Sequence, residues 1–296
     1  MRIGFVGIGR MGWPMAARLV AAGHEVAAAD AAEGRALSFA LASGARPAAS
    51  AGDAAHGAEV IITMLPDSKA VAVALDAVLP SLAPGTLVLE MSSGAPSQTV
   101  RLAELVTGAG GGLVDAPVSG GVSRAETGEL SIMVGGAEAD IARADPLLRA
   151  MGTTITRTGG VGSAHAMKAL NNLVSAGGFL IGIEALLIGQ RFGLDPALMV
   201  DVLNASTGMN NSTQKKFRQF VLSRSFGSGF GLDLMVKDVS IALELGKETR
   251  TPTPFAALLR DLSAAAAAML GEGRDHTELA RLAEALAGEE LKTGGA

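Results

Sequence analysis

Ile3-Gly-Phe-Val-Gly-Ile-Gly-Arg-Met-Gly12 is the stretch of sequence that decides the fold. Its first four residues form a short apolar run typical of a buried strand, and helix-forming residues follow from Met11 to Ala22. Between them, Gly7, Gly9 and Gly12 have the spacing Gly-x-Gly-x-x-Gly. In a strand–turn–helix unit, the first glycine makes a tight turn, the second lets a pyrophosphate approach the backbone, and the third lets the helix pack on the strand. Because the helix N-terminus adds oriented N–H donors, the sequence predicts a dinucleotide site.

The composition is typical of a globular enzyme. A length of 296 residues predicts two domains of ordinary size, and a hydrophobic fraction of 49% is enough for a large core. The net charge of −5 points to neither a nucleic acid nor an anionic membrane surface as partner. The absence of cysteine excludes disulfides, thiolate catalysis and cysteine metal sites, and the four histidines lack the spacing of metal ligands. We therefore expect no metal, no nucleic acid and no membrane partner.

The location predicted from the sequence is cytoplasmic. Arg10, Pro14 and Arg18 interrupt the N-terminal apolar stretch too early for a signal peptide. The uncharged residues 169–183 contain two asparagines and are too short for a bilayer span. The absence of cysteine is also compatible with a reducing compartment.

Strand-like and helix-like segments alternate over the first half of the chain. We expect strands over residues 3–6, 25–29, 60–64, 87–90, 113–116, 131–134 and 154–158. We expect helices between them over residues 34–42, 69–79, 97–107 and 138–150. Such alternation predicts a doubly wound, largely parallel sheet.

Gly159-Gly-Val-Gly162 is the predicted boundary between two domains. We expect an α/β Rossmann-type NAD-binding domain over residues 1–162 and an all-helical substrate and oligomerisation domain over residues 163–296. Residues 163–191 predict one long central helix that joins them, about 43 Å long at about 1.5 Å per residue. Because this helix is apolar on nearly every face, we expect it to be buried and covered by a partner subunit, in a homodimer or homotetramer. The polar residues 289–296 are expected to fray.

Asp30 ends the second predicted strand, eighteen positions after Gly12 (30 minus 12). An acid at this place can accept hydrogen bonds from the adenosine ribose, and its charge repels a 2′-phosphate, which favours NAD over NADP. The alternative is a capping box with Glu33 at the start of the next helix, and both roles are compatible. Arg10 and Arg35 could approach a phosphate, so NADP stays possible.

Three further segments follow predicted strands, where open α/β sheets bind their ligands. Met64–Asp67 and Ser92–Pro96 are, taken alone, ordinary turns. Ser119, Gly120 and Gly121 place a hydroxyl beside two unhindered backbone amides, which suits a carboxylate. A flexible turn is the alternative for this last segment.

Lys168, Asn171 and Asn172 are the candidates for chemistry on the long helix. Lys168 and Asn172 are four residues apart and therefore share one helix face. A single helical lysine is more often a solvated surface residue, but this helix has almost no polar face. An amine partly removed from water exchanges its proton more readily near neutral pH, which suits a general acid or base. Lys237 and Asp238, taken alone, indicate a surface ion pair.

Four blocks of sequence occur in an order that resembles the β-hydroxyacid dehydrogenases, the family of 3-hydroxyisobutyrate dehydrogenase and tartronate semialdehyde reductase. The blocks are residues 4–16, residues 115–122 with 128–136, residues 162–172, and residues 230–238. The sequence departs from the family pattern at Asp67, where asparagine is common, and at Ala31 and Ala32, where polar residues are common. These departures lie outside the block that contains Lys168.

The resemblance implies a role for each matching residue. Lys168 corresponds to the catalytic lysine, Asn172 to the amide that orients the substrate, and Ser119, Gly120 and Gly121 to the residues that bind its carboxylate. The cofactor-binding positions are Gly7, Ile8, Gly9, Arg10, Met11, Gly12, Asp30, Met64, Leu65, Pro66, Ser93 and Lys237. An aspartate at the position of Asp30 goes with NAD in this family.

The implied reaction transfers a hydride between a short 3-hydroxy acid and NAD or NADP, with Lys168 accepting the hydroxyl proton. The product is the corresponding semialdehyde or oxo acid. Two alternatives stay open: an imine reductase, which shares this architecture but usually lacks the lysine, and a catalytically silent dinucleotide-binding protein. The bland alternative, an inert helical scaffold, does not explain the four blocks.

Overall fold

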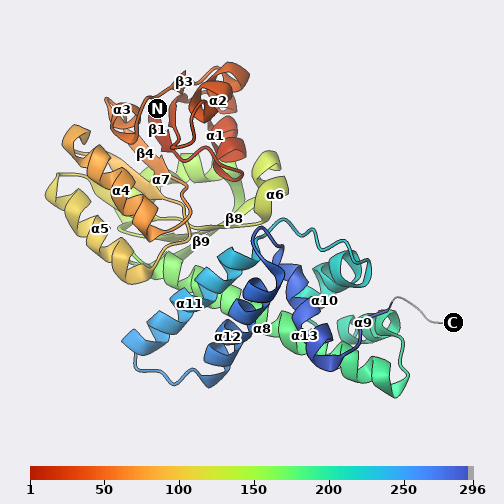
Figure 1. Cartoon of the computed structure of the whole chain (residues 1–296). Coiled ribbons are helices and arrows are strands. Elements are labelled where there is room, and N and C mark those ends of the chain that lie inside the picture. The colour runs from red at the N-terminus through yellow and green to blue at the C-terminus, as the bar shows by residue number, and fades with distance from the viewer. Residues whose placement is uncertain (293–296) are drawn as a thin grey trace. The chain divides into compact units, whose positions relative to one another are not determined.

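The computed structural model of the chain, described over residues 1–292, divides into two compact units, Met1–Lys168 and Ala169–Ala296 (Figure 1). The first unit is an α/β unit built on one mixed sheet. The second consists of helices. The expected combination of a Rossmann-type α/β part and a helical part is therefore confirmed.

The sheet of the first unit has the strand order β3-β2-β1-β4-β5-β6-β8-β7, with β9 pairing to β8. Its strands are β1 (Arg2–Val6), β2 (Glu25–Ala29), β3 (Arg46–Pro47), β4 (Val60–Thr63), β5 (Leu87–Glu90), β6 (Gly112–Asp115), β7 (Val118–Ser119), β8 (Leu130–Gly135) and β9 (Gly152–Gly159). All pairs from β3 to β6 are parallel, whereas β8 is antiparallel to both β6 and β7. The doubly wound sheet is as predicted, but the two-residue strands β3 and β7 were not predicted.

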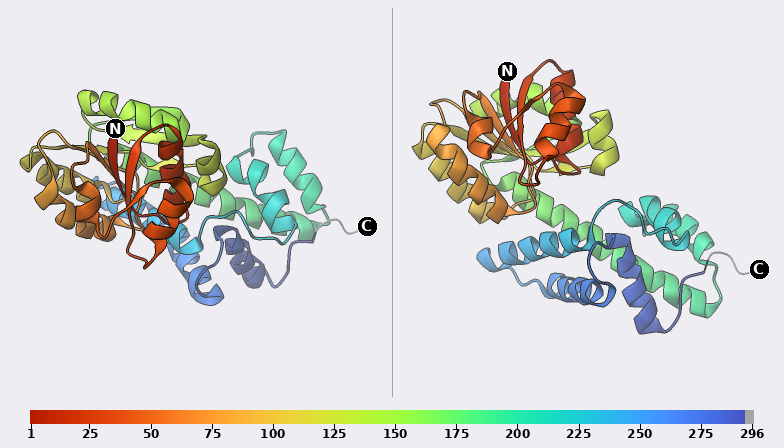
Figure 2. Two further views of the ribbon diagram at one scale, coloured as in Figure 1. Left: turned by 90° about the horizontal axis from the view of Figure 1, so that it is seen from above. Right: turned by 45° about the horizontal axis from the view of Figure 1, so that its top comes forward.

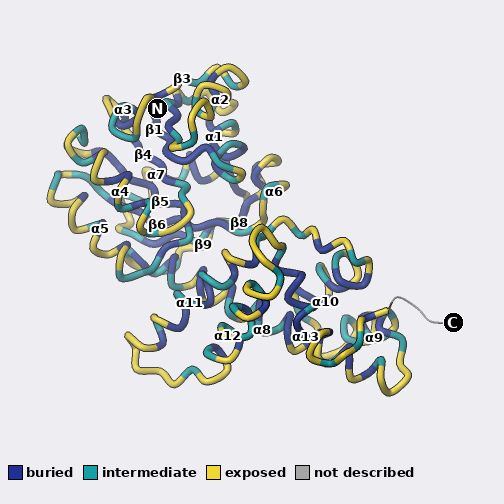
Figure 3. The backbone as a smooth tube through the Cα atoms, viewed as in Figure 1, coloured by how far each residue is buried: buried dark blue, intermediate teal, exposed yellow. Residues whose placement is uncertain are grey.

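Helices cover both faces of this sheet (Figure 2). They are α1 (Gly12–Ala21), α2 (Arg35–Ser43), α3 (Ala51–Ala55), α4 (Ser68–Val78), α5 (Pro96–Gly108), α6 (Gly121–Thr127) and α7 (Glu138–Met151), with a short 3₁₀ turn at Leu79–Ser81. Leu87 and Leu89 of β5 pack in one core cluster with α1 and α7, and Val88 packs in another with α4 and α5. Burial on both faces explains why the central strands are continuous apolar runs, and these strands are buried along their length (Figure 3).

The second unit packs helices around its own core. Its elements are α8 (Ser163–Phe192), which begins in the first unit, α9 (Pro196–Asn204), α10 (Asn211–Lys215), a π-helical turn η2 (Phe217–Leu222), α11 (Leu232–Glu248), α12 (Pro254–Leu270), a 3₁₀ turn η3 (His276–Glu278) and α13 (Leu279–Ala287). Phe179 of α8 packs edge-on against Phe217, with ring centroids 5.6 Å apart. Aromatic packing of this kind fixes η2 against the long helix.

The long helix α8 is a single element, as predicted, but it is not covered on every side. Val174, Ile181 and Ile188 lie seven residues apart and are 74%, 63% and 71% exposed. Among the helices of residues 1–292, α8 alone is long and apolar enough to cross a bilayer by length and composition. Half of its most apolar window is nevertheless buried within the fold, which is typical of the core helix of a globular protein.

The predicted fraying of the C-terminal tail is wrong for residues 289–292. The Glu289 carboxylate accepts hydrogen bonds from Gln190 Nε2 at 2.7 Å and from Arg191 Nε at 3.0 Å, and Leu291 is buried. The end of the tail, residues 293–296, lies outside the described residues. These anchoring contacts come from α8, about 100 residues earlier in the chain, so the polar composition of the tail gave no sign of them.

Candidate active site

The glycine-rich turn between β1 and α1 leaves open space at one of its three glycines. Gly7 has a φ of +102°, and a Cβ at this position would lie 2.3 Å from the carbonyl oxygen of Met64. A Cβ at Gly12 would lie 1.8 Å from the carbonyl oxygen of Gly7. At Gly9, by contrast, a Cβ would meet nothing within 4 Å. Packing therefore requires the first and third glycines, and the second offers the unobstructed backbone that a phosphate needs.

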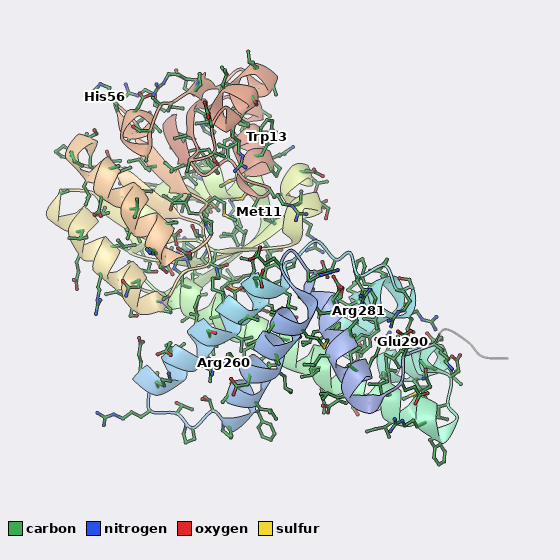
Figure 4. All side chains as sticks on the ribbon, in the orientation of Figure 1. Met11, Trp13, His56, Arg260, Arg281 and Glu290 are labelled. Atoms are coloured by element: carbon green, nitrogen blue, oxygen red, sulfur yellow. The ribbon has the colours of Figure 1, made fainter. Side chains whose placement is uncertain are left out.

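The start of α1 is available to a ligand as well. Met11 precedes the helix, and no side chain within residues 1–292 caps it. The first N–H groups of a helix have no partner inside the helix and form a favourable site for an anion. Met11 and Trp13 mark this end of α1 in Figure 4.

Asp30 lies beside this turn and is fixed by three donors. Its carboxylate accepts the N–H of Ile8 at 2.7 Å, the N–H of Ala32 at 2.8 Å and a guanidinium N–H of Arg35 at 3.1 Å. Helix α2 is preceded by Gly34, and its N-cap forms no side-chain hydrogen bond within the described residues. The alternative of a capping box formed by Asp30 is therefore wrong. The carboxylate is instead fixed at the end of β2, next to the glycine turn.

The turns after β4 and β5 are joined to each other. The N–H of Leu65 donates to Ser92 Oγ at 2.9 Å, and the N–H of Ala95 donates to Ser68 Oγ at 2.8 Å. Asp67 caps α4 by accepting the N–H of Ala70 at 2.8 Å. These contacts place the segment that contains Met64 and Pro66 alongside the segment that contains Ser93, at the carboxyl edge of the parallel strands.

Lys168 and Ser119 are in direct contact. The Nζ of Lys168 donates to Ser119 Oγ at 2.9 Å, and the lysine is only 8% exposed. Ser119 ends β7, and Gly120 and Gly121 follow with φ angles of 133° and 70°, which favour glycine. Because Gly121 is the first residue of α6, this segment is a strand–helix junction.

A buried carboxylate fixes the start of α8, five residues before Lys168. Asp115, the last residue of β6, accepts the N–H groups of Gly162 at 2.8 Å, Ala164 at 2.9 Å and His165 at 3.0 Å. The negative charge lies where a helix N-terminus favours it, while burial raises the pKa of Asp115 above its usual value. Asp115 is the first residue of the sequence block 115–122, but its contact with the start of α8 is not predictable from the sequence.

His165 completes this cluster and faces acceptors with both ring nitrogens. Its Nε2 lies 2.7 Å from Glu90 Oε2 and 2.9 Å from the carbonyl oxygen of Ser92. Its Nδ1 lies 2.8 Å from the hydroxyl of Thr99, whose own hydrogen is donated to the Ala95 carbonyl at 3.1 Å. Two N–H donors on one ring require the imidazolium form.

The electrostatics of the cluster agree with this protonation state. Burial opposes the charge of His165, but Glu90, Asp115 and the carbonyl of Ser92 together outweigh burial and raise the pKa of His165. Burial likewise opposes ionisation of Glu90, yet His165 and the hydrogen bonds from Ser92 lower the pKa of Glu90. We call Glu90, Asp115 and His165 the helix-start cluster. It ties the beginning of α8, and hence Lys168, to the ends of β5 and β6.

On the next turn of α8, Asn172 is oriented by a buried acid of the second unit. Its Nδ2 donates to Asp238 Oδ2 at 2.6 Å, and the side-chain amide of Asn171 donates to Asn172 Oδ1 at 3.1 Å. Lys237 Nζ lies 3.3 Å from the other oxygen of Asp238, which is 2% exposed. Lys237 and Asp238 form an ion pair on α11, but the expectation of a surface pair is wrong because Asp238 is buried and positions Asn172.

Two family profiles match successive parts of the chain. The family profile described as the NAD binding domain of 6-phosphogluconate dehydrogenase matches residues 2–160. The profile described as NAD-binding of NADP-dependent 3-hydroxyisobutyrate dehydrogenase matches residues 162–283.

Individual relatives are similar over nearly their full lengths. The chain is 36% identical to 2-(hydroxymethyl)glutarate dehydrogenase of Eubacterium barkeri over 278 residues, which cover 93% of this chain and 92% of that protein. It is 37% identical to 3-hydroxyisobutyrate dehydrogenase of Pseudomonas aeruginosa, with coverage of 95% and 97%. A solved structure of Mycobacterium tuberculosis 3-hydroxyisobutyrate dehydrogenase with L-serine has a TM-score of 0.88 at 32% identity and covers 96% of this chain and 98% of that one. The chain belongs to the β-hydroxyacid dehydrogenase family of NAD(P)-dependent oxidoreductases.

Proposed function

We propose that this enzyme interconverts a short 3-hydroxy acid and its semialdehyde or oxo form, in the manner of 3-hydroxyisobutyrate dehydrogenase. The observation that carries the proposal is the contact of 2.9 Å between Lys168 Nζ and Ser119 Oγ. Because Ser119 directly precedes Gly120 and Gly121, the contact supports the proposal that Lys168 transfers a proton next to a substrate carboxylate bound at these glycines. The carboxylate and the reacting hydroxyl of a short hydroxy acid are only a few bonds apart and match this arrangement.

Lys168 is the proposed general acid and base. The glycine turn and Asp30 would hold the dinucleotide, which would supply the hydride acceptor for oxidation of the alcohol carbon. The neutral amine of Lys168 takes the proton from the hydroxyl group, which becomes a carbonyl. In reduction, the ammonium of Lys168 returns that proton to the oxygen on which negative charge develops. Asn172, oriented by Asp238, holds the substrate oxygen by its side-chain amide.

NAD is the proposed cofactor, and NADP is possible. Asp30 is positioned to accept hydrogen bonds from the ribose hydroxyls, and its charge disfavours a 2′-phosphate. Arg35, which lies 3.1 Å from Asp30, provides a positive charge at the same place and keeps NADP within reach. The other proposed cofactor-binding residues are Gly7, Ile8, Gly9, Arg10, Met11, Gly12, Met64, Leu65, Pro66, Ser93 and Lys237.

A homodimer or homotetramer in the cytoplasm is the proposed state of the enzyme. The exposed stripe of Val174, Ile181 and Ile188 supports association, because large exposed apolar side chains in a row mark interaction surfaces. A second copy of the chain is its proposed partner. We also propose a domain boundary at Gly162, which gives domains of residues 1–162 and 163–296.

An imine reductase activity and a silent binding role are less supported. The two relatives at 36% and 37% identity are named as dehydrogenases of hydroxy acids. A silent protein would have no use for a buried lysine beside an oriented amide. Reduction of cyclic imines would favour the first alternative over the proposal.

The experiment is a steady-state assay of NAD and NADP reduction with a panel of short 3-hydroxy acids, comparing the wild-type enzyme with Lys168→Ala. We expect turnover to fall by about 10²- to 10⁴-fold, the usual contribution of a general acid–base group. Dinucleotide binding, measured by fluorescence titration, should stay unchanged. Lys69→Ala, at a lysine elsewhere in the first unit, is the control and should behave as wild type. Normal turnover by Lys168→Ala contradicts the proposal.

A further inference from the structure

Lys216 carries a largely buried amine that the proposed reaction does not use. It follows α10 and immediately precedes η2, and its Nζ donates a hydrogen bond to Ser175 Oγ at 3.1 Å. Within residues 1–292, no carboxylate oxygen lies within 4.0 Å of this Nζ. Removing an ammonium from water without a contacting anion costs free energy, so the arrangement requires an explanation.

The acid that acts electrostatically on Lys216 already accepts hydrogen bonds from other donors. Asp275 influences Lys216 electrostatically, but its carboxylate accepts the hydroxyl of Ser228 at 2.8 Å and the N–H of Gly229 at 2.8 Å. It also accepts the N–H and the hydroxyl of Thr277, at 2.9 Å and 2.6 Å. Asp275 therefore holds the loop before η3 in place and does not form an ion pair with Lys216.

The neighbouring His276 does not balance the charge of the Lys216 ammonium either. Burial and then the charge of Lys216 lower the pKa of His276 to about 4, so its ring is neutral at physiological pH. Burial also lowers the pKa of Lys216 to about 8, against the opposing effect of Asp275. The amine is thus still mostly protonated at neutral pH, and an anionic ligand would stabilise it.

The position of Ser175 connects this amine to the proposed catalytic face. Ser175 lies seven residues after Lys168 and three after Asn172 on the continuous helix α8. Seven residues are close to two helical turns, so these three side chains share one face, with about 10 Å along the axis between the first and the last. Ser175, whose hydroxyl accepts the hydrogen bond of the Lys216 amine, therefore follows Lys168 and Asn172 along the same face of this helix.

We propose that Lys216 binds a second carboxylate of the substrate, which makes the preferred substrates 3-hydroxy acids that carry another acidic group a few carbons from the reacting hydroxyl. This inference rests on the proposed function of Lys168. Ammonium and carboxylate form short charge-assisted hydrogen bonds, and Ser175 adds a hydroxyl donor. Lys216 is thus a specificity-determining residue, and its charge favours dianionic over monoanionic substrates.

Three hydroxy acids that differ only in the substituent at C2 test the proposal. 3-Hydroxyisobutyrate carries a methyl group at C2, whereas 2-(hydroxymethyl)glutarate carries a 2-carboxyethyl group at the same carbon. 2-(Hydroxymethyl)pentanoate supplies a side chain of similar length without the charge. Both enantiomers of each acid are assayed for kcat and KM with the wild type, Lys216→Met and Lys216→Arg. Lys215→Met, at the exposed neighbouring lysine, is the matched control.

The expected result is a loss of discrimination in one variant. The ratio compared is kcat/KM for 2-(hydroxymethyl)glutarate divided by kcat/KM for 2-(hydroxymethyl)pentanoate. In Lys216→Met this ratio falls by about 10- to 100-fold, the size expected for loss of one charge-assisted hydrogen bond, and the change is mainly in KM. Lys216→Arg keeps most of the preference, and Lys215→Met leaves the ratio at the wild-type value. Thermal melts of each variant verify that it is folded.

Other outcomes separate this inference from the proposed function. Two results would overturn the inference alone while Lys168-dependent turnover of the monocarboxylic acids is present. One is that the enzyme shows no preference for the dicarboxylic acid. The other is that Lys216→Met retains this preference. Absence of turnover with every acid contradicts the proposed function and overturns the inference with it.

Discussion

Two buried clusters of titratable groups differ in how completely their polar atoms are paired. In the helix-start cluster, Glu90, Asp115 and His165 satisfy one another and the first N–H groups of α8. In the second unit, Lys216 has a hydroxyl and no contacting anion, and within residues 1–292 the buried Nε2 of His276 has no hydrogen-bond partner. A complete network fixes geometry, whereas an incomplete one indicates that something else binds there.

The pKa values of the two buried histidines, His165 and His276, show how the two clusters differ. The carboxylate of Glu90 raises the pKa of His165 despite burial, whereas burial lowers the pKa of His276 to about 4. The first ring is a cation that contributes to the structure, and the second is a neutral ring packed against Phe179 and Phe230. Each ring lies near a carboxylate, but Glu90 is 2.7 Å from His165, whereas Asp275 is 3.6 Å from His276 and the charge of Lys216 opposes its protonation. Burial alone therefore does not decide the charge of a histidine, because the surrounding charges contribute as well.

Breaking the complete cluster should have the largest effect. Glu90→Gln leaves the buried charge of His165 without its partner, and we expect a loss of about 3–5 kcal/mol in the free energy of unfolding. Because the start of α8 also positions Lys168, kcat should fall while the affinity for the dinucleotide stays close to wild type. Urea denaturation and steady-state kinetics measure the two effects. Glu104→Gln, at an exposed position of α5, is the control.

A double variant tests whether the two residues act as one unit. Glu90→Gln combined with His165→Gln removes both charges, so its loss of stability should be smaller than the sum of the two single losses. Additive losses would mean that the two side chains act independently, against the assignment of a joint positioning role.

Removing the unpaired charge should have the opposite sign and a smaller size. Because the pKa of Lys216 is about 8 in the folded protein and 10.5 in its ordinary state, the unfolded chain holds more protons between these values. Stability therefore rises with pH across this window, and the full cost of the buried charge is present below it. We expect Lys216→Met to stabilise the ligand-free protein at pH 7 by on the order of 1–2 kcal/mol, after allowance for remaining contact with solvent.

The measurement is the unfolding free energy of Lys216→Met relative to wild type at several pH values. The gain should be largest at neutral pH and should disappear as the pH rises above the ordinary lysine value. Lys215→Met should show no such dependence. A destabilised Lys216→Met variant would mean that the amine is structurally paired, contrary to the comparison of the two clusters.

The sequence predicts the architecture because the relevant signals are local. The glycine spacing, the apolar strands and the uncharged stretch of α8 each lie within a continuous segment, and each predicted element of this kind is present. The two-residue strands β3 and β7 and the short helices α3 and α6 were missed, because segments of two to seven residues carry too little periodicity.

The site is less predictable because its partners are distant in the sequence. Glu90, Asp115 and His165 meet only because β5 and β6 are neighbours and α8 begins at their ends. One signal was available, namely a glutamate that ends an otherwise apolar strand. Nothing local to Asp238 indicated that it is buried and bonded to Asn172, and Lys216 was not distinguished from its exposed neighbour Lys215.

The smallest effect is a difference in protonation that leaves the fold unchanged. At about pH 5.5, between the lowered and the ordinary histidine pKa, His165 should be a cation and His276 should be neutral. The stabilising contribution of His165 is fully present below its ordinary pKa of 6.5 and is lost as the pH rises through its raised value. The contribution of the neutral His276 is lost as the pH falls from 6.5 towards 4.

NMR spectra of the histidine ring nitrogens, assigned with His165→Gln and His276→Gln, measure both titrations, and the exposed His56 is an internal control. If the rings of His165 and His276 titrate together, the two clusters do not differ in charge, and the unpaired Lys216 loses the contrast that marks it as a ligand site.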